Sequence, residues 1–296
     1  MNTVNNNERA PEHSLSEKEF QFICKLVYDT TGIVLDGRKR EMVYRRLMRR
    51  TRDLKLASFK AYCQLLQTDK EGEFPKFINA ITTNLTSFFR EEHHFDYLRD
   101  DFIPKHIKKY AHTRRLRIWS AACSTGEEPY SLAITLLQAM APLLGEWDIK
   151  ILASDLDTDV LAAAKAGIYK DERIKDLPTS LTKSWFRRGS GENAHHVKVN
   201  PSMSELITFK QLNLLHEWPM RGPFDVIMCR NVLIYFDKAT QKKLIHRYHQ
   251  LLRPGGLLIL GHSESLAKDE SFFRVKGRTI FEKPIAVDAP VRKGTL

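Results

Sequence analysis

The sequence lacks the features that would place it in a membrane, outside the cell or around a structural metal. No segment approaches the roughly 18 consecutive apolar residues that a membrane span requires. The polar, Asn-rich start contains no apolar stretch of the kind found in secretory signals. The four cysteines show neither a Cys-x-x-Cys pair nor the spacing of metal ligands. We therefore expect a cytoplasmic protein with reduced thiols, no metal and no direct insertion into a membrane.

Positive charge is abundant but unevenly distributed. Of the 296 residues, 42% are hydrophobic and 28% are charged, as in globular proteins with an ample core. The net charge is +11, but Arg38–Arg52 alone holds eight basic residues and one acid, which leaves only +4 for the rest of the chain. A general nucleic-acid-binding protein would spread basic groups over its functional face as well. The clustering instead predicts a single cationic docking surface.

Hydrophobic periodicity divides the chain into two parts. From Ser16, whose spacing to Glu19 is that of a capping box, apolar residues recur at helical intervals. From Leu116, short apolar strands alternate with helices, which is typical of a mainly parallel sheet covered on both faces. The predicted organisation is a helical docking domain over 16–83, a helical linker over 84–115, an α/β domain over 116–284 with a β insertion at about 168–206, and disordered tails over 1–15 and 285–296.

The most informative stretch is Trp119–Ser131, in which a strand runs through a Ser-Thr-Gly turn into a helix. Such a turn presents backbone N–H groups and a helix N-terminus to a ligand. Glu127 and Glu128 follow the turn and would repel a dinucleotide pyrophosphate. They suit a ligand with an amino group, a sulfonium charge or ribose hydroxyls, and S-adenosylmethionine carries all three. Taken alone, the stretch is equally compatible with an ordinary βα turn that bears solvated acids.

Polar residues also follow the other predicted strands. Asp155 closes the second strand, Asn213 and Leu214 follow the third, and Arg230 and Asn231 follow the fourth and lead to Tyr235. Each residue alone has an ordinary explanation as a cap, a turn residue or a packing residue. In doubly wound sheets, however, ligands bind beyond the carboxyl ends of the strands. The arrival of these residues at successive strand ends therefore predicts one binding site.

Several longer motifs identify a family. They are Thr-Asn-x-Thr-x-Phe-Phe-Arg at 83–90, Ser-Thr-Gly-Glu-Glu-Pro-Tyr-Ser at 124–131, Ala-Ser-Asp-x-Asp at 153–157, Cys-Arg-Asn-Val-x-Ile-Tyr-Phe-Asp at 229–237 and Gly-His-Ser-Glu at 261–264. With these motifs the chain resembles the CheR-type chemotaxis receptor methyltransferases, from about Ser16 to Phe281. The multi-glycine first motif of the wider methyltransferase superfamily is absent and only Gly126 remains, a trait that the receptor methyltransferases share.

The resemblance implies both an architecture and a reaction. The fold would be a Rossmann-like, doubly wound methyltransferase domain with a small N-terminal all-helical domain and an inserted β subdomain. The reaction would transfer a methyl group from S-adenosylmethionine to glutamate side chains of chemotaxis receptors, as in sensory adaptation, and would leave glutamate methyl esters and S-adenosylhomocysteine. No metal is implied.

The resemblance also assigns roles to individual residues. Arg90 and Tyr235 would lie beside the methyl group and orient the incoming carboxylate, and Asp155 would bind the ribose hydroxyls. Glu128 is preferred to Glu127 for the polar end of the cofactor, although the sequence leaves this choice open. The full set of implied cofactor-binding residues is Asn84, Thr86, Arg90, Glu128, Asp155, Asn213, Leu214, Arg230 and Asn231.

Two surfaces would then recognise the receptor. The basic helix would dock on the acidic helical bundle of the receptor through Arg45, Arg46, Arg49 and Arg50. An exposed strand edge of the insertion would accept the C-terminal aromatic peptide of a receptor by β-augmentation, near Arg187, Arg188, Gly189 and Gly191. We expect a monomer, while the receptor, its glutamates and the binding of the tail peptide are not fixed by the sequence.

Other functions are less well supported by the residues. An RNA methyltransferase would suit the cofactor and the positive charge, but the chain has no Asn-Pro-Pro-Tyr-type motif and its basic groups are confined to one helix. A non-catalytic signalling adaptor that binds the cofactor would not need Arg90, Asn231 and Tyr235 together. A nicotinamide-dependent dehydrogenase is disfavoured by the missing glycine fingerprint and by the acids at the turn.

Overall fold

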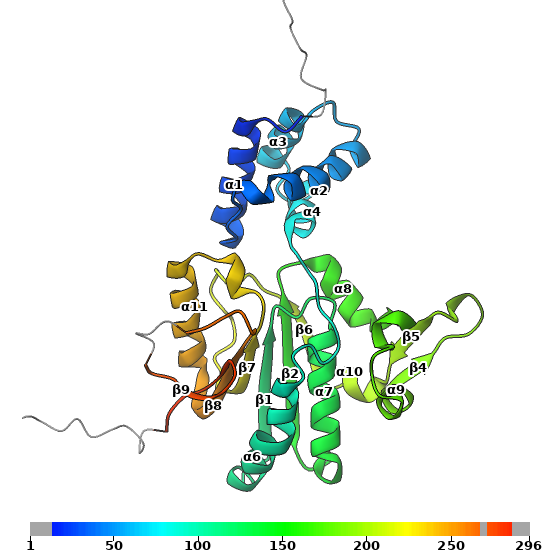
Figure 1. Cartoon of the computed structure of the whole chain (residues 1–296), viewed down its shortest axis with the longest axis vertical. Helices are drawn as coiled ribbons and strands as arrows, with labels where there is room; N and C mark the ends of the chain where they lie inside the picture. The colour runs from blue at the N-terminus through cyan, green and yellow to red at the C-terminus, as the bar shows by residue number, and fades with distance from the viewer. Residues whose placement is uncertain (1–13, 267–270, 286–296) are drawn as a thin grey trace, which may run out of the picture. The chain divides into compact units, whose positions relative to one another are not determined.

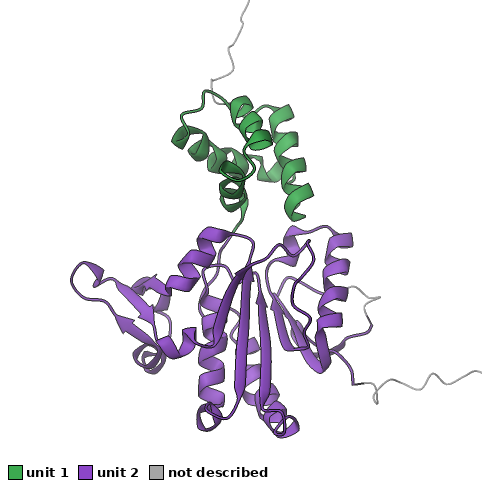
Figure 2. Cartoon of the chain, turned by 180° about the vertical axis from the view of Figure 1, so that it is seen from behind, with its two compact units in different colours: residues 1–83 green, residues 84–296 purple. Residues whose placement is uncertain are grey.

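The computed structural model describes residues 14–266 and 271–285 of the chain. The chain divides into two compact units between Thr83 and Asn84 (Figure 2). Nearly all of the tail residues that were predicted to be disordered lie outside the described residues. None of the described helices combines the length and the apolar composition needed to cross a membrane.

The smaller unit is all-helical in the part that the structure describes. Its elements are α1 (Glu17–Thr31), the 3-10 turn η1 (Gly37–Lys39), α2 (Arg40–Asp53), α3 (Phe59–Thr68) and α4 (Glu73–Ile81). The predicted capping box begins α1, because Ser16 Oγ accepts from Glu19 N while the Glu19 carboxylate accepts from Ser16 N. Gly32 ends α1 at φ 73°, a left-handed conformation that glycine adopts without strain. Buried aromatic rings, including Tyr62 and Phe77, pack in the core between the helices.

Strands and helices alternate through the larger unit. The strands of its main sheet are β1 (Arg115–Ala121), β2 (Asp148–Asp155), β6 (Ile207–Gln211), β7 (Phe224–Cys229), β8 (Leu252–Leu260), β9 (Arg274–Gly277) and β10 (Ile280–Glu282). Their order is β6-β2-β1-β7-β8-β10-β9, and Figure 1 labels each of them except β10. The run from β6 to β8 is parallel, whereas β10 is antiparallel to both of its neighbours. The prediction of a mainly parallel sheet is confirmed.

Helices cover both faces of this sheet. The helical elements of this unit outside its insertion are α5 (His93–Tyr97), the π-helical turn η2 (Leu98–Phe102), α6 (Ile103–Lys109), α7 (Glu127–Ala139), η3 (Ala141–Leu143), α8 (Thr158–Ala166), η6 (Leu233–Tyr235) and α11 (Lys238–Leu251). On β1, the Trp119 ring packs 5.4 Å from the Tyr248 ring of α11. The adjacent Ile118 points to the opposite face, where it belongs to the same buried cluster as Leu132 of α7. The sheet is therefore doubly wound, as predicted.

The linker predicted as helical departs from that expectation over its first residues. Residues 84–92 contain no helix, and the first helix of the segment begins at His93. Phe89 and Glu91 have φ values of 50° and 56°, which an α-helix excludes. The whole segment belongs to the larger unit. Residues 84–92 are thus an irregular segment of the larger unit, bonded to Ser124 and Asp157 through Asn84, rather than a helical spacer between domains.

A small antiparallel sheet interrupts the larger unit between α8 and β6. Its strands are β3 (Ile168–Lys170), β4 (Phe186–Arg188) and β5 (His196–Val199), in the order β3-β5-β4. The accompanying elements are η4 (Asp171–Ile174), α9 (Thr179–Trp185), η5 (Gly191–Asn193) and α10 (Pro201–Ser204). Figure 1 shows this insertion to one side of the main sheet. The sequence indicated a β insertion here.

Candidate functional site

The candidate site lies at the edge of the main sheet where β1, β2, β6 and β7 end. From β1 the sheet grows outward through β2 to β6, and the chain then crosses to β7 on the other side of β1. This reversal between β1 and β7 is the topological switch point at which doubly wound sheets bind ligands. The residues predicted at strand ends all belong to this edge, namely Asp155, Asn213, Leu214, Arg230 and Asn231.

The turn after β1 has an unusual backbone conformation, and hydrogen bonds to β2 hold it in place. Ala122, Ser124 and Gly126 have φ values of 79°, 49° and 98°. The N–H groups of Ala122 and Cys123 both donate to the carbonyl oxygen of Ser154, at 2.8 and 2.9 Å. A Cβ atom at Gly126 would lie 2.9 Å from the Cβ of Ala164, so both the conformation and the space require glycine. The helix α7 begins at the next residue.

Asp155 fixes this turn from the end of β2. Its Oδ2 accepts from Ser124 N at 2.8 Å, and its Oδ1 accepts from Asp157 N at 3.0 Å. The residue is only 9% exposed. Burial raises the pKa of the Asp155 carboxyl to about 6, although the N–H groups of Asp157 and Ser124 act in the opposite direction. Each carboxylate oxygen retains acceptor capacity, which suits a ligand with two neighbouring hydroxyl donors.

A buried charge cluster lies between β7 and the irregular segment 84–92. The guanidinium of Arg230 lies 3.0 Å from Glu128 Oε2 and 3.3 Å from Glu91 Oε2, and it also donates to the carbonyl oxygen of Arg90. The Arg230 side chain is 2% exposed. Glu128 Oε1 accepts from Ser120 Oγ at 2.7 Å. One arginine thus compensates two nearly buried carboxylates at the switch point.

The two carboxylates of this cluster differ in their pKa. Burial raises the pKa of Glu128, and the Arg230 charge only partly opposes it. Burial also acts to raise the pKa of Glu91, but the hydrogen bond to His262 and the Arg230 charge outweigh it and bring the value to about 2. His262 Nδ1 lies 3.0 Å from Glu91 Oε1. The second partner explains why Glu91 is the more firmly ionised of the two.

Glu127 and Glu128 have different partners. Glu127 is fully buried, accepts from Thr125 Oγ1 at 2.6 Å and forms an ion pair with Arg173 of η4. The side chain of Glu128 keeps 10% of its surface exposed. Of the two acids between which the sequence left the choice open, Glu128 is the one with surface that a ligand can reach.

The irregular segment brings Asn84 and Arg90 to the same edge. Asn84 Nδ2 donates to Asp157 Oδ2 at 2.7 Å, and the Asn84 carbonyl oxygen accepts from Ser124 Oγ at 2.8 Å. Arg90 Nη1 donates to the carbonyl oxygen of Leu85 at 3.0 Å. The segment is therefore fastened to the turn after β1 at Ser124 and to the turn after β2 at Asp157.

A single acid organises the loop that carries Tyr235. Glu264 accepts from three backbone N–H groups, those of Asn231 at 2.9 Å, Gly261 at 2.6 Å and Ile234 at 3.3 Å. Tyr235 ends the turn η6 and is half-buried. Among the described residues, no hydrogen bond is formed by its hydroxyl group. That hydroxyl is therefore available to a ligand.

The loop after β6 is held by α11. Asn213 Oδ1 accepts from Leu215 N at 3.0 Å, which closes a short turn. Arg247 Nη1 donates to the carbonyl oxygen of Leu214 at 2.7 Å, and its guanidinium lies 3.7 Å from the Trp218 ring centroid. The burial of Arg247 lowers its pKa. The loop that carries two predicted ligand residues is thus fixed from the neighbouring helix.

Several residues of the site escaped the sequence analysis. They are Ser120, Glu91, Arg173, Arg247, His262 and Glu264. Four of them lie in or next to a stretch that the sequence analysis singled out: His262 and Glu264 in the Gly-His-Ser-Glu motif, Ser120 in Trp119–Ser131, and Glu91 next to Arg90. Arg173 and Arg247 act on backbone groups 87 and 33 residues away, and no local pattern marks them.

The four arginines predicted for docking divide into two pairs along α2. Arg46 Nη1 donates to the carbonyl oxygen of Ile81 at 2.7 Å, and Arg50 forms two hydrogen bonds, of 2.9 and 2.6 Å, with the buried Glu73. This pair is engaged within the smaller unit. The exposed pair consists of Arg45 and Arg49.

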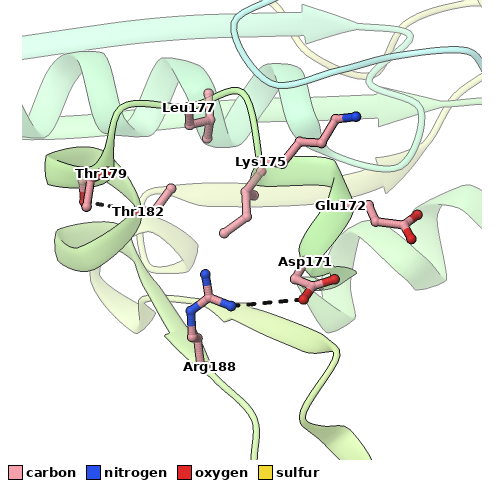
Figure 3. Close-up of a pocket in the computed structure, with 8 residues that line it drawn as sticks. Asp171, Glu172, Lys175, Leu177, Thr179, Thr182 and Arg188 are labelled. Atoms are coloured by element: carbon pink, nitrogen blue, oxygen red, sulfur yellow. Dashed lines mark hydrogen bonds and ion pairs between the residues drawn. The ribbon is translucent and has the colours of Figure 1, made fainter.

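The insertion presents both a strand edge and a pocket. β4 pairs with β5 along one side, and no strand among the described residues pairs with its other side. A pocket of about 350 Å³ adjoins it, where Arg188 points toward Asp171, 4.0 Å away (Figure 3). Because successive strand residues point to opposite faces, Arg187 faces away from this pocket. Gly189 and Gly191 lie in the exposed turn that follows β4.

Within residues 14–266 and 271–285, no group of three His, Cys, Asp or Glu side chains is arranged to hold a metal ion. The acceptors at the sheet edge fit a different kind of ligand. Asp155 suits a diol, and the Glu128 carboxylate beside a helix N-terminus suits a ligand that presents both an amino group and an anionic group.

Comparison with known proteins gives a consistent result. Residues 84–281 match the family described as CheR methyltransferase, SAM binding domain, and residues 18–82 match CheR methyltransferase, all-alpha domain. The chain is 44% identical over 274 residues to the chemotaxis protein methyltransferase of Escherichia coli (strain K12), covering 90% of this chain and 91% of that protein. It is 46% identical over 273 residues to chemotaxis protein methyltransferase 2 of Pseudomonas aeruginosa, covering 91% and 94%.

Proposed function

Because this chain belongs to the CheR methyltransferase family, we propose that it is a chemotaxis protein methyltransferase that transfers a methyl group from S-adenosylmethionine to glutamate side chains of chemoreceptors. The products are glutamate methyl esters and S-adenosylhomocysteine. One observation carries this proposal: in a chain matched along both of its domains, the family motifs converge on the switch point of a doubly wound sheet.

For this reaction the main task of the protein is to position the receptor carboxylate against the methyl group. When bound, S-adenosylmethionine supplies an electrophilic methyl group on a sulfonium centre. The receptor glutamate, with an ordinary pKa of about 4.3, is already an anionic nucleophile at neutral pH and needs no general base. The protein must hold a carboxylate oxygen in line behind the methyl group and exclude water. Because opposite charges approach and cancel, rigid alignment contributes more than strong ion pairing in the ground state.

Residues at the sheet edge divide this work. Asp155 binds the ribose hydroxyls, and Glu128 with the N-terminus of α7 binds the polar end of the cofactor. Arg90 and the free hydroxyl of Tyr235 hold the receptor carboxylate. The other residues that we assign to the cofactor pocket are Asn84, Thr86, Asn213, Leu214, Arg230 and Asn231.

Calorimetry tests the cofactor assignment without a receptor. We expect the full chain to bind S-adenosylhomocysteine with one site and to show no heat of binding with NAD. Asp155→Ala should weaken the binding of S-adenosylhomocysteine, because the buried acceptor for the ribose is lost. Binding of NAD, or failure of the wild-type chain to bind S-adenosylhomocysteine, would contradict the proposed function.

We propose that the exposed pair Arg45 and Arg49 of α2 docks on an acidic receptor surface. The double variant Arg45→Glu/Arg49→Glu should raise the KM for receptor by about 2- to 30-fold, since exposed ionic contacts contribute about 0.2–1 kcal/mol each. Added salt should raise the wild-type KM and have less effect on the variant. The matched control is Lys18→Glu/Lys60→Glu, which changes the charge of the same unit equally at other exposed positions. Equal KM values for the two double variants would exclude this docking surface.

We further propose that the open edge of β4 accepts the C-terminal peptide of a receptor as an added strand, with its terminal carboxylate at Arg188. The unpaired strand edge and the adjoining pocket support this proposal. A synthetic receptor-tail peptide with a free carboxylate should bind, and its C-terminal amide should bind more weakly. Arg188→Ala should abolish this difference while Arg187→Ala keeps it. A titration without binding would eliminate the proposal.

A further inference from the structure

Three side chains of the insertion, those of Tyr169, Phe186 and Arg173, contact chain segments on the cofactor side of the main sheet. Tyr169 of β3 donates from its hydroxyl to the carbonyl oxygen of Thr125, at 2.7 Å, within the Ser-Thr-Gly turn. Phe186 of β4 packs edge-on against Phe88, two residues before Arg90, with ring centroids 5.2 Å apart. The third contact is made by Arg173 of η4. The insertion is thus attached to two chain segments that form one wall of the cofactor site, namely the Ser-Thr-Gly turn and residues 84–90.

Arg173 joins these two segments with one side chain. Its Nη2 donates to the carbonyl oxygen of Thr86 at 2.8 Å, and its Nε donates to Glu127 Oε1 at 3.1 Å. The other oxygen of Glu127 accepts from Thr125 Oγ1 at 2.6 Å. A guanidinium presents several donors in a fixed plane and can serve a carboxylate and a carbonyl at once, which the single ammonium of lysine does less well.

The electrostatic setting gives this contact its importance. The Glu127 side chain is 0% exposed, and its only ion pair among the described residues is with Arg173. It is also adjacent to Glu128, which already shares Arg230 with Glu91. Without Arg173, the first turn of α7 would hold an uncompensated buried carboxylate next to the acid that faces the cofactor. A buried charge without a partner is energetically costly, and it shifts the pKa values of the neighbouring ionisable groups.

We propose that Arg173 is a positioning residue for the methyltransferase reaction: it cross-links segment 84–90 to the Ser-Thr-Gly turn and so sets the geometry in which both meet the cofactor. This rests on the proposed function. The insertion then has a second role besides any peptide binding, because it completes the wall of the cofactor site. By linkage, a ligand that shifts η4 would change the affinity for the cofactor by the same factor as the cofactor changes the affinity for that ligand.

The test is calorimetric titration of the full chain with S-adenosylhomocysteine. We expect Arg173→Met to weaken binding by about 10- to 100-fold, as the loss of charge-assisted hydrogen bonds predicts, and Arg173→Lys to weaken it less. Adding Glu127→Gln to Arg173→Met should recover part of the affinity, because it removes the unpaired charge. The matched control is Lys183→Met, which removes an exposed cation of α9 in the same insertion and should leave the affinity unchanged.

A purely structural role would give a different pattern. The melting temperature of Arg173→Met would fall while its affinity for S-adenosylhomocysteine stayed that of the wild type, and this result would overturn the proposal. Equal losses of affinity in Arg173→Met and Lys183→Met would also overturn it. If Arg173→Met does not fold, the affinities of Arg173→Lys and Lys183→Met are compared instead, and equal affinities would overturn the proposal. Failure of the wild-type chain to bind would instead count against the proposed function.

Discussion

Replacing Arg230 with methionine is expected to lower the free energy of unfolding of the larger unit by about 3–5 kcal/mol, the usual cost of removing one partner from a buried ion pair. The substitution keeps most of the side-chain volume but leaves the carboxylates of Glu91 and Glu128 without their shared cation. The affinity for the cofactor should fall together with the stability, since both carboxylates border the Ser-Thr-Gly turn and the segment 84–92, which form the site. This is the largest single effect that the structure predicts.

Tryptophan fluorescence during denaturant unfolding measures this effect selectively. All four tryptophans of the chain lie beyond residue 83 and therefore report on the larger unit. The matched control is Arg99→Met, because Arg99 also contacts two carboxylates, Asp96 and Asp100, but its side chain is 43% exposed. Arg99→Met should lower the free energy of unfolding by less than about 1 kcal/mol. Equal losses for the two variants would show that the Arg230 cluster contributes no more than a surface network.

The loss of stability in Arg230→Met should depend on pH in a characteristic way. The pKa of Glu91 is depressed from 4.5 to about 2 in the folded protein. A depressed carboxyl pKa contributes stability that is fully present above the unfolded value and is lost as the pH falls through the folded value. The stability difference between wild type and Arg230→Met should therefore be largest at neutral pH and should narrow between about pH 4.5 and 2. A constant difference over this range would contradict the assignment.

Replacing Tyr235 with phenylalanine should reduce the turnover number for receptor methylation by about 10- to 150-fold. This is the rate equivalent of losing one hydrogen bond of about 1.5–3 kcal/mol to a charged group in the transition state. The hydroxyl is unbonded among the described residues, so the variant should keep its stability and its affinity for S-adenosylhomocysteine. The control is Ile234→Val at the adjacent, half-exposed position, which removes no polar group. Unchanged turnover in Tyr235→Phe would remove Tyr235 from the mechanism.

The parts of the site that follow from local sequence were predictable. The turn at Gly126 and the acid at the end of β2 are signalled by their immediate neighbours, because a strand–turn–helix unit is built from contiguous residues. The mainly parallel pairing of the strands also follows from the alternation of strands and helices, and the family resemblance supplied the Rossmann-like class of fold. The match to the CheR family decides against the two alternative functions, those of an RNA methyltransferase and of a dehydrogenase.

What the sequence did not reveal depends on distant partners. Residues 84–92 were expected to be helical, but Asn84 bonds to Asp157 and Ser124, and these long-range contacts override the local preference. The arginines of α2 look equivalent in sequence, yet Arg46 and Arg50 bond to groups 35 and 23 residues further along the chain. Charge patterning identifies a basic helix, but it does not separate arginines that stabilise the fold from those that face a partner.

Glutamate methylation is tested most directly with the purified chain, chemoreceptor in membrane vesicles and S-adenosylmethionine labelled in the methyl group. We expect label on the receptor that is released as methanol by mild base, as a glutamate methyl ester requires, and no label on RNA offered in parallel. Base-stable label, label on RNA, or a receptor that stays unlabelled while the chain binds S-adenosylhomocysteine would contradict it.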